Sequence, residues 1–180
     1  KEESMKKLII LISIILLTGC TDIMNTPSSK VEEFLGKYQT MDTSIVKELD
    51  DTIEEMNASD NYKKEYKSLL LKQYQNLSYK IKDEKIDGTT ANVEVEIEVF
   101  DYYNTLENVN EDIDKNSDDF KDEKDKSRKE KIEEYKIKKL KATTNKTKYQ
   151  IIFTLTKKDG KWTLDKLSDD DIKKIHGLSE

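Results

Sequence analysis

Several residue types that carry chemistry are nearly absent from this chain. Its 180 residues include one cysteine, one histidine, one proline and one tryptophan. A single cysteine excludes a framework of disulfide bonds, and one cysteine with one histidine cannot complete a usual tetrahedral zinc site. The net charge of −6 argues against nucleic acid or anionic lipid as the main ligand, because both attract positively charged surfaces. The composition therefore favours a protein that uses no cofactor.

The first 20 residues contain the most specific pattern. Two lysines precede an apolar run over 8–17. This run is too short for a transmembrane helix, which needs about 20 apolar residues, and it lacks the polar face of an amphipathic core helix. A basic start, a short apolar core and a small residue before a cleavage point predict a secretory signal peptide over 1–19. Residues 1–4 precede Met5, a suitable initiator, and are interpreted as a start-site artefact.

The end of this segment resembles the lipobox of bacterial lipoproteins. Leu17, Thr18 and Gly19 stand directly before Cys20. The resemblance implies cleavage before Cys20, a lipid on that cysteine, and attachment to the extracytoplasmic face of the cell membrane. Two or more acyl chains make a stable anchor by themselves. The membrane is therefore one expected partner.

The sequence after the cysteine is long enough for one domain. Residues 20–29 are short and polar and are expected to form a tether between the lipid and the domain. The remaining residues, 30–180, are expected to form a single domain. A chain of this length buries about 68–70% of its unfolded surface, so it needs no disulfides for stability.

Two periodicities predict the secondary structure of this domain. Apolar residues three and four apart, preceded by residues that cap helices, predict helices at 30–39, 44–56, 60–77 and 168–177. Strict alternation predicts strands at 79–81, 91–99, 148–156 and 162–164, with turns at Asp87-Gly88 and Asp159-Gly160. Strands with one wet face indicate an antiparallel sheet. The fold class is therefore α+β, with N-terminal helices packed on a four-stranded antiparallel sheet of two hairpins.

A long charged segment separates the two predicted hairpins. Residues 101–144 contain no glycine or proline, and no apolar residue occurs between Lys121 and Lys131. Apolar residues on both sides keep a helical spacing. We expect one long charged helix, or two helices joined near Asn116-Ser117, with a solvated middle that projects from the body. A disordered charged linker is the alternative.

The order of these elements resembles a family of small lipoproteins of Gram-positive bacteria. These proteins have a cone-shaped, cystatin-like domain similar to nuclear transport factor two. The resemblance rests on residues 154–178, where a strand, the turn Lys157 to Trp162 and an acid-started helix follow in order. The lipobox and the Asp87-Gly88 turn support it. Most members have no known activity, and enzymes on this fold use Asp, Tyr or His inside the cone in motifs that this chain lacks.

One acidic segment has the spacing of a calcium loop. The residues at positions one, three, five, seven and twelve of such a loop are Asp112, Asp114, Asn116, Asp118 and Glu123. Position six requires glycine for a sharp turn, but Ser117 stands there, and Asp119 replaces the apolar residue at position eight. We therefore expect a solvated acidic helix that holds no specific metal ion.

Three other sets of residues have a chemical and a structural interpretation. His176 is expected in the last turn of a short helix, where a partly charged imidazole suits the helix dipole better than catalysis. Trp162 is expected to be a core anchor rather than a ligand platform. The tyrosines could line a pocket, but their helical spacing favours core edges with hydroxyls in water; they are Tyr62, Tyr66, Tyr74 and Tyr79.

Three functions are compatible with the sequence. The first is a non-enzymatic surface lipoprotein that binds an envelope protein or a small ligand. The second is an enzyme with an isomerase-like or hydrolase-like pocket in the cone. The third is an envelope spacer that uses the long charged helix as its contact surface. A buried titratable group with a shifted pKa would favour the enzyme, whereas an apolar lining or a flat patch would favour binding.

Overall fold

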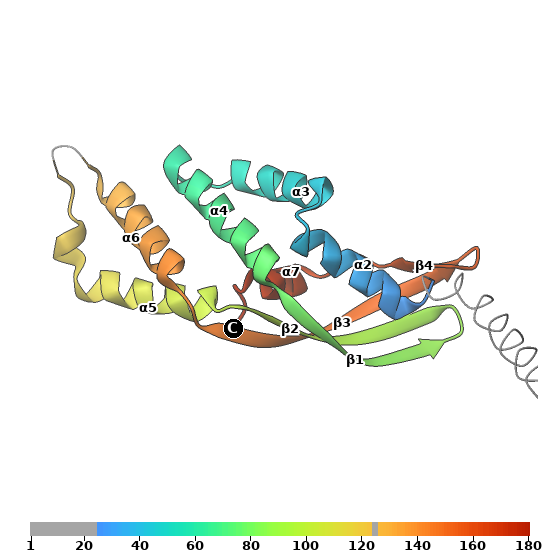
Figure 1. The fold of residues 1–180 in the computed structure, drawn as a ribbon. Helices are drawn as coiled ribbons and strands as arrows, with labels where there is room; N and C mark the ends of the chain where they lie inside the picture. The colour runs from blue at the N-terminus through green and yellow to red at the C-terminus, as the bar shows by residue number, and fades with distance from the viewer. Residues whose placement is uncertain (1–24, 124–125) are drawn as a thin grey trace, which may run out of the picture.

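The computed structural model describes residues 25–123 and 126–180 (Figure 1). The helices are α2 (Pro27–Gln39), α3 (Thr43–Glu54), α4 (Asp60–Asn76), α5 (Tyr102–Lys115), the 3-10 turn η1 (Ser117–Phe120), α6 (Arg128–Ala142) and α7 (Asp169–His176). The strands are β1 (Ser78–Asp87), β2 (Thr90–Phe100), β3 (Lys146–Lys158) and β4 (Lys161–Leu164). In these two ranges no helix combines the length and the apolar character that crossing a membrane would require.

The four strands form one antiparallel sheet in the order β1-β2-β3-β4. Alternate residues of β2 are buried and meet buried residues of β3, as in the pairs Val93–Phe153 and Val95–Ile151. The intervening glutamates of β2 face the opposite side, where Glu96 pairs with Lys148. The alternation predicted over 91–99 is therefore confirmed, and with it the α+β class.

Helices α2, α3, α4 and α7 lie on one face of the sheet, and no described helix covers the other face (Figure 1). The main core fills the space between this face and the helices. Trp162 is 5% exposed and belongs to that core, so its interpretation as a core anchor is confirmed. Lys157 lies over its ring, with Nζ 5.4 Å from the centroid.

Helix α2 begins at Pro27, three residues earlier than expected. Thr26 is its N-cap: the Thr26 Oγ1 accepts from the Ser29 amide, and the Ser29 Oγ accepts from the Thr26 amide. Ser29 therefore occupies the third position of this capping box. Proline is favoured in the first turn because its missing N–H has no helical partner there. Residues 27–29 consequently belong to the helix and not to the tether.

The charged segment is not one long helix but two helices that fold back on each other (Figure 1). Helix α5 ends at Lys115 and Asn116 is its C-cap, as the two-helix alternative predicted. Apolar residues of α5, η1 and α6 then meet in a small core of Val109, Ile113 and Phe120, with Ile132 and Tyr135 beside it. This packing excludes a disordered linker for the described parts of the segment. The strand pairing of β2 with β3 continues to the base of this α5–α6 hairpin, at Phe100 and Lys146.

Candidate functional site

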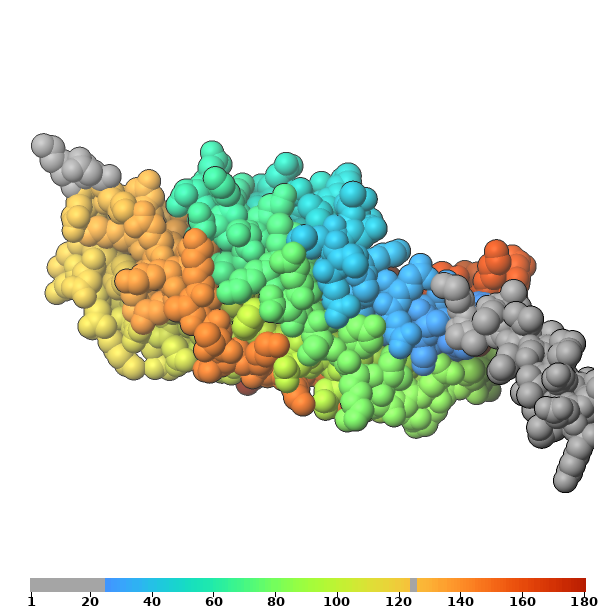
Figure 2. All heavy atoms as spheres, in the orientation of Figure 1, coloured from blue at the N-terminus to red at the C-terminus, as the bar shows by residue number. Residues whose placement is uncertain are grey.

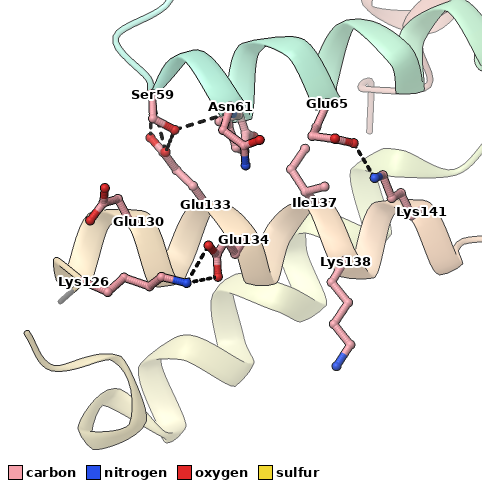
Figure 3. Close-up of a pocket in the computed structure, with 11 residues that line it drawn as sticks. Ser59, Asn61, Glu65, Lys126, Glu130, Glu133, Glu134, Ile137, Lys138 and Lys141 are labelled. Carbon is pink, nitrogen blue, oxygen red and sulfur yellow. Dashed lines mark hydrogen bonds and ion pairs between the residues drawn. The ribbon is translucent and has the colours of Figure 1, made fainter. Parts of the chain in front are cut away.

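Two hollows lie between the start of α4 and α6. Figure 2 shows the atoms of these helices, in teal and orange, side by side at the surface. One hollow, of about 510 Å³, is drawn in Figure 3 and includes Asn61, Glu65 and Lys138 in its lining. A second, of about 580 Å³, includes Met56, Ile132 and Lys136. Tyr62 and Glu133 line both hollows, which are together called the α4–α6 groove.

Glu133 and Ser59 meet at the centre of this groove (Figure 3). The Ser59 Oγ donates to the Glu133 Oε2 at 2.5 Å, and the Ser59 amide donates to the Glu133 Oε1 at 3.3 Å. Ser59 is also the N-cap of α4, because its Oγ accepts from the Tyr62 amide at 3.2 Å. The Glu133 carboxylate therefore lies at the positive end of the α4 dipole, which favours a negative charge there.

Sequence reasoning missed Glu133, which is only 8% exposed. It lies in a run of charged residues that suggests a solvated helix. One signal was available: Glu133 stands four residues before Ile137 and seven before Leu140, both buried, on the same face of α6. A carboxylate on a buried helical face needs a partner elsewhere in the fold, and Ser59 supplies it.

Two ion pairs engage four of the charged residues around the first hollow (Figure 3). Lys141 forms an ion pair with Glu65, and Lys126 pairs with Glu134 at 2.6 Å. The hydrogen bond from Lys141 lowers the pKa of Glu65. The Lys138 side chain points away from α4.

The second hollow has an apolar floor and a basic rim. Its half-buried apolar residues are Met56, Ala58, Tyr62 and Ile132, and its cations are Arg128, Lys129 and Lys136. The Tyr62 ring stacks on Tyr66, with centroids 5.7 Å apart and planes 10° apart. Burial, and then the charge of Glu133, raise the pKa of the Tyr62 hydroxyl. Its proton is therefore held firmly at neutral pH.

His176 lies in a different part of the molecule, beside the main core. Its Nε2 is 2.8 Å from the Tyr74 Oη. Burial lowers the pKa of His176 to about 4, so the imidazole is neutral at physiological pH. The expected interaction of a charged imidazole with the helix dipole is therefore wrong. The expectation of a solvated hydroxyl is also wrong for Tyr74, whose side chain is buried against His176.

The cavity beside this pair is small. Its volume is about 90 Å³, and its lining includes Tyr38, Leu49, Tyr74, Ile172 and His176. This volume is well below the range of about 300–1,000 Å³ that is usual for small-molecule sites. It leaves no room for a substrate of ordinary size. The shifted pKa of His176 therefore reflects packing in the core and not a substrate pocket.

The acidic residues with calcium-loop spacing do not converge in the structure. Asp112 accepts from the Tyr135 Oη at 3.0 Å, Asp118 pairs with Lys121 at 2.8 Å, and Glu123 pairs with Lys131. Asn116 donates its side-chain amide to the Asp112 carbonyl, and Asp114 is exposed on α5. In residues 25–123 and 126–180, no group of three histidine, cysteine or acidic side chains is placed to hold a metal ion.

The backbone of this acidic segment also differs from the expected solvated helix. It consists of the end of α5, the η1 turn and an extended stretch in which Glu123 bridges to Lys126. Phe120, in the middle of this segment, is buried and packs against Ile132 and Tyr135 of α6. The other predicted site residues, Leu17, Thr18, Gly19 and Cys20, lie outside the described residues.

Comparisons with known proteins place this chain in no family. No protein-family model matches it, and neither does any curated protein. Among solved structures it is similar to YcdA, a candidate lipoprotein from Bacillus subtilis subsp. subtilis strain 168, with 13% sequence identity and a TM-score of 0.42. The alignment covers 89% of this chain and 50% of that one, so this chain spans about half the length of YcdA. A similarity of this size establishes neither a shared fold nor a shared function.

Proposed function

We propose that this chain is a lipid-anchored protein of the bacterial cell envelope that binds another protein through the α4–α6 groove. It acts without catalysing a reaction. The observation that carries this proposal is the position of the groove, which lies at the end of the molecule opposite the start of the described chain (Figure 1). A lipid at Cys20 would therefore leave the groove directed away from the membrane.

The first described residue connects the anchor to a defined end of the domain. The Asn25 side chain donates from Nδ2 to the Gly160 carbonyl at 2.9 Å and accepts from the Trp162 amide at 3.2 Å. Cys20 is five residues before Asn25, so the two are at most about 18 Å apart in a fully extended chain. The turn between β3 and β4 consequently stays close to the bilayer surface, and the α5–α6 hairpin extends away from it.

Two features support binding rather than catalysis. The Ser59 Oγ accepts from the Tyr62 amide as the N-cap of α4 and donates its proton to the buried Glu133 of α6, so both contacts stabilise the fold. A catalytic serine is usually activated by a neighbouring base such as histidine, and the single histidine is on α7 beside the main core. The isomerase-like or hydrolase-like alternative therefore has no favourable geometry at the groove.

The proposal includes a relationship to cone-shaped domains similar to nuclear transport factor two. It is supported by the four helices on one face of the sheet, where such a domain has its pocket. The cavity of about 90 Å³ between Tyr74 and its neighbours would be what remains of that pocket. The α5–α6 hairpin would be an addition that carries the binding surface away from the filled cone.

Site-specific cross-linking tests this proposal. A photoreactive amino acid at Asn61, which is exposed in the groove, should give one defined adduct in intact cells. The same amino acid at Thr154, on the open face of the sheet, is the matched control and should give none. Excess purified chain should compete for the Asn61 adduct. Equal labelling from both positions, or none from Asn61, would contradict the proposal and favour a spacer that uses another surface.

A further inference from the structure

We propose that the second hollow of the groove binds an acidic amphipathic segment of the partner protein. In such a segment, apolar side chains alternate with groups of carboxylates. This inference rests on the proposed function, since it names the chemistry of the partner at the same groove. It is carried by the difference in charge between the two hollows and by the apolar floor of the second.

The two hollows share one wall but differ in their charges. The second hollow contains three cations and one carboxylate, Glu133, whereas the first contains four carboxylates and three lysines. The second hollow is therefore a basic patch on a chain whose net charge is −6. A basic patch on an acidic protein directs an acidic ligand to one place, because the rest of the surface repels it.

Two of the three cations of the second hollow remain available to a ligand. Lys129 pairs with Glu133 at 3.9 Å and donates to the Asn57 Oδ1 at 3.4 Å. Within the part of the chain that the structure describes, neither Arg128 nor Lys136 forms an ion pair. Arg128 is the single arginine of the chain, and its planar guanidinium can hold a carboxylate through two parallel hydrogen bonds.

The arrangement along α6 fits an amphipathic ligand. Arg128, Ile132 and Lys136 follow one another at intervals of four residues, so they lie on one face of the helix with the apolar residue in the middle. Tyr62 and Met56 complete the apolar floor from the side of α4 and the loop before it. A ligand with an apolar side chain between carboxylates would complement this surface at all three positions.

The position and extent of the groove favour a protein segment over a lipid. The groove is at the end of the molecule opposite Asn25, so a lipid-anchored chain would hold it away from the bilayer (Figure 1). The two hollows, of about 510 and 580 Å³, have Tyr62 and Glu133 as common lining residues. The second hollow is large enough for several side chains of a bound segment.

Binding of two synthetic peptides to the full chain in a neutral detergent tests the charge. The peptides have equal length and the same leucines, but one carries glutamates where the other carries lysines. Fluorescence anisotropy should show that the glutamate peptide binds at least about tenfold more tightly, with an affinity that falls at high salt. A lysine peptide that binds equally well, or a glutamate peptide that does not bind, would overturn the inference.

Two charge reversals locate the binding site. Lys136→Glu should weaken binding of the glutamate peptide by about tenfold or more, because it puts a like charge into the second hollow. Lys80→Glu makes the same change on an exposed lysine of β1 that lines neither hollow, and it should alter the affinity by less than about twofold. Equal effects of both variants would overturn the inference. Circular dichroism verifies that each variant is folded, and Lys136→Gln replaces Lys136→Glu if the reversal unfolds the hairpin.

Two further measurements separate the sources of failure. Vesicles of phosphatidylglycerol should not compete with the peptide, and competition that Lys136→Glu abolishes would make an anionic lipid the occupant and overturn the inference. In cells, Lys136→Glu should reduce the adduct formed from Asn61. An undiminished adduct with no peptide binding would refute the acidic segment alone, whereas absence of the adduct in the unaltered chain would refute the proposed function.

Discussion

The side-chain amide of Gln73 binds both backbone groups of Phe100. The Phe100 amide donates to the Gln73 Oε1 at 2.8 Å, and the Gln73 Nε2 donates to the Phe100 carbonyl at 2.9 Å. The same Nε2 donates to the His176 carbonyl at 3.0 Å. Gln73 is fully buried, so this one residue of α4 satisfies the polar groups where β2 and α7 end. These contacts hold the base of the α5–α6 hairpin on the main core.

Gln73→Leu should destabilise the fold strongly. It leaves the amide and the carbonyl of Phe100 and the carbonyl of His176 without a partner in a dry environment. Each unsatisfied group costs about 1–3 kcal/mol, so we expect a loss of about 3 kcal/mol or more. Urea unfolding measures it. Gln150→Leu is the control on the open face of the sheet and should change the free energy of unfolding by less than about 0.5 kcal/mol.

Gly177→Ala should be more costly than Gly160→Ala. Both glycines have positive φ, +70° and +77°, which costs an alanine about 1–2 kcal/mol. A Cβ at Gly177 would also collide with the Phe100 carbonyl and the Gln73 Nε2, whereas one at Gly160 would meet no atom within 4 Å. We expect about 1–2 kcal/mol at Gly160 and at least about 2 kcal/mol more at Gly177. Similar losses of unfolding free energy would show that the contact at Gly177 relaxes easily.

His176 should make the fold less stable in mild acid. Burial lowers its pKa to about 4 in the folded chain, below the usual value of 6.5 that applies in the unfolded chain. Between these two pH values the unfolded chain binds more protons than the folded chain. The contribution of the neutral His176 to stability is therefore complete above about pH 6.5 and is lost as the pH falls towards 4. We expect a loss of about 2 kcal/mol between pH 7 and pH 4.5.

Urea unfolding at these two pH values, with and without His176→Gln, isolates this effect. The variant cannot take up a proton at that position, so most of its dependence on pH in this range should disappear. A variant with the same dependence as the unaltered chain would assign the effect to the carboxylates instead.

Ser59→Ala should cost more than Ser127→Ala, although both serines are helix N-caps. Loss of an N-cap costs about 1 kcal/mol, which is the expectation for Ser127 on the exposed start of α6. Ser59→Ala also removes the hydroxyl that donates to the buried Glu133, and we expect a total of about 2–3 kcal/mol. Thermal or urea unfolding of the two variants gives the comparison. Equal losses would mean that water replaces the hydroxyl at Glu133.

Cys20→Ala should release the protein from membranes or leave its signal peptide uncleaved, because the anchor depends on the cysteine thiol. Fractionation of cells and electrophoretic mobility measure both outcomes. Thr21→Ala, next to it, is the control and should fractionate like the unaltered chain. A Cys20→Ala chain with unchanged fractionation and mobility would end the proposal of a lipid anchor.

The sequence by itself determined the elements whose formation is local. Strict alternation from Ala91 to Val99 specified a strand with one buried face, because successive side chains of a strand point to opposite sides. Asp159-Gly160 specified a turn, because both residues adopt positive φ there. Asn116 was also readable as a break between helices. In each case the information lies in a few consecutive residues and the geometry of the backbone between them.

The tertiary structure alone decided which charged and polar groups became buried. Glu133 and the solvated glutamate beside it, Glu134, are the same residue type in one helix, but only Glu133 meets Ser59. His176 is neutral because it is buried against Tyr74, about 100 residues earlier in the chain. The α5–α6 hairpin is held together by the packing of Phe120 on Tyr135. Burial and pKa depend on neighbours that are distant in the sequence. No local periodicity encodes those neighbours, so the groove appeared only once the chain was folded.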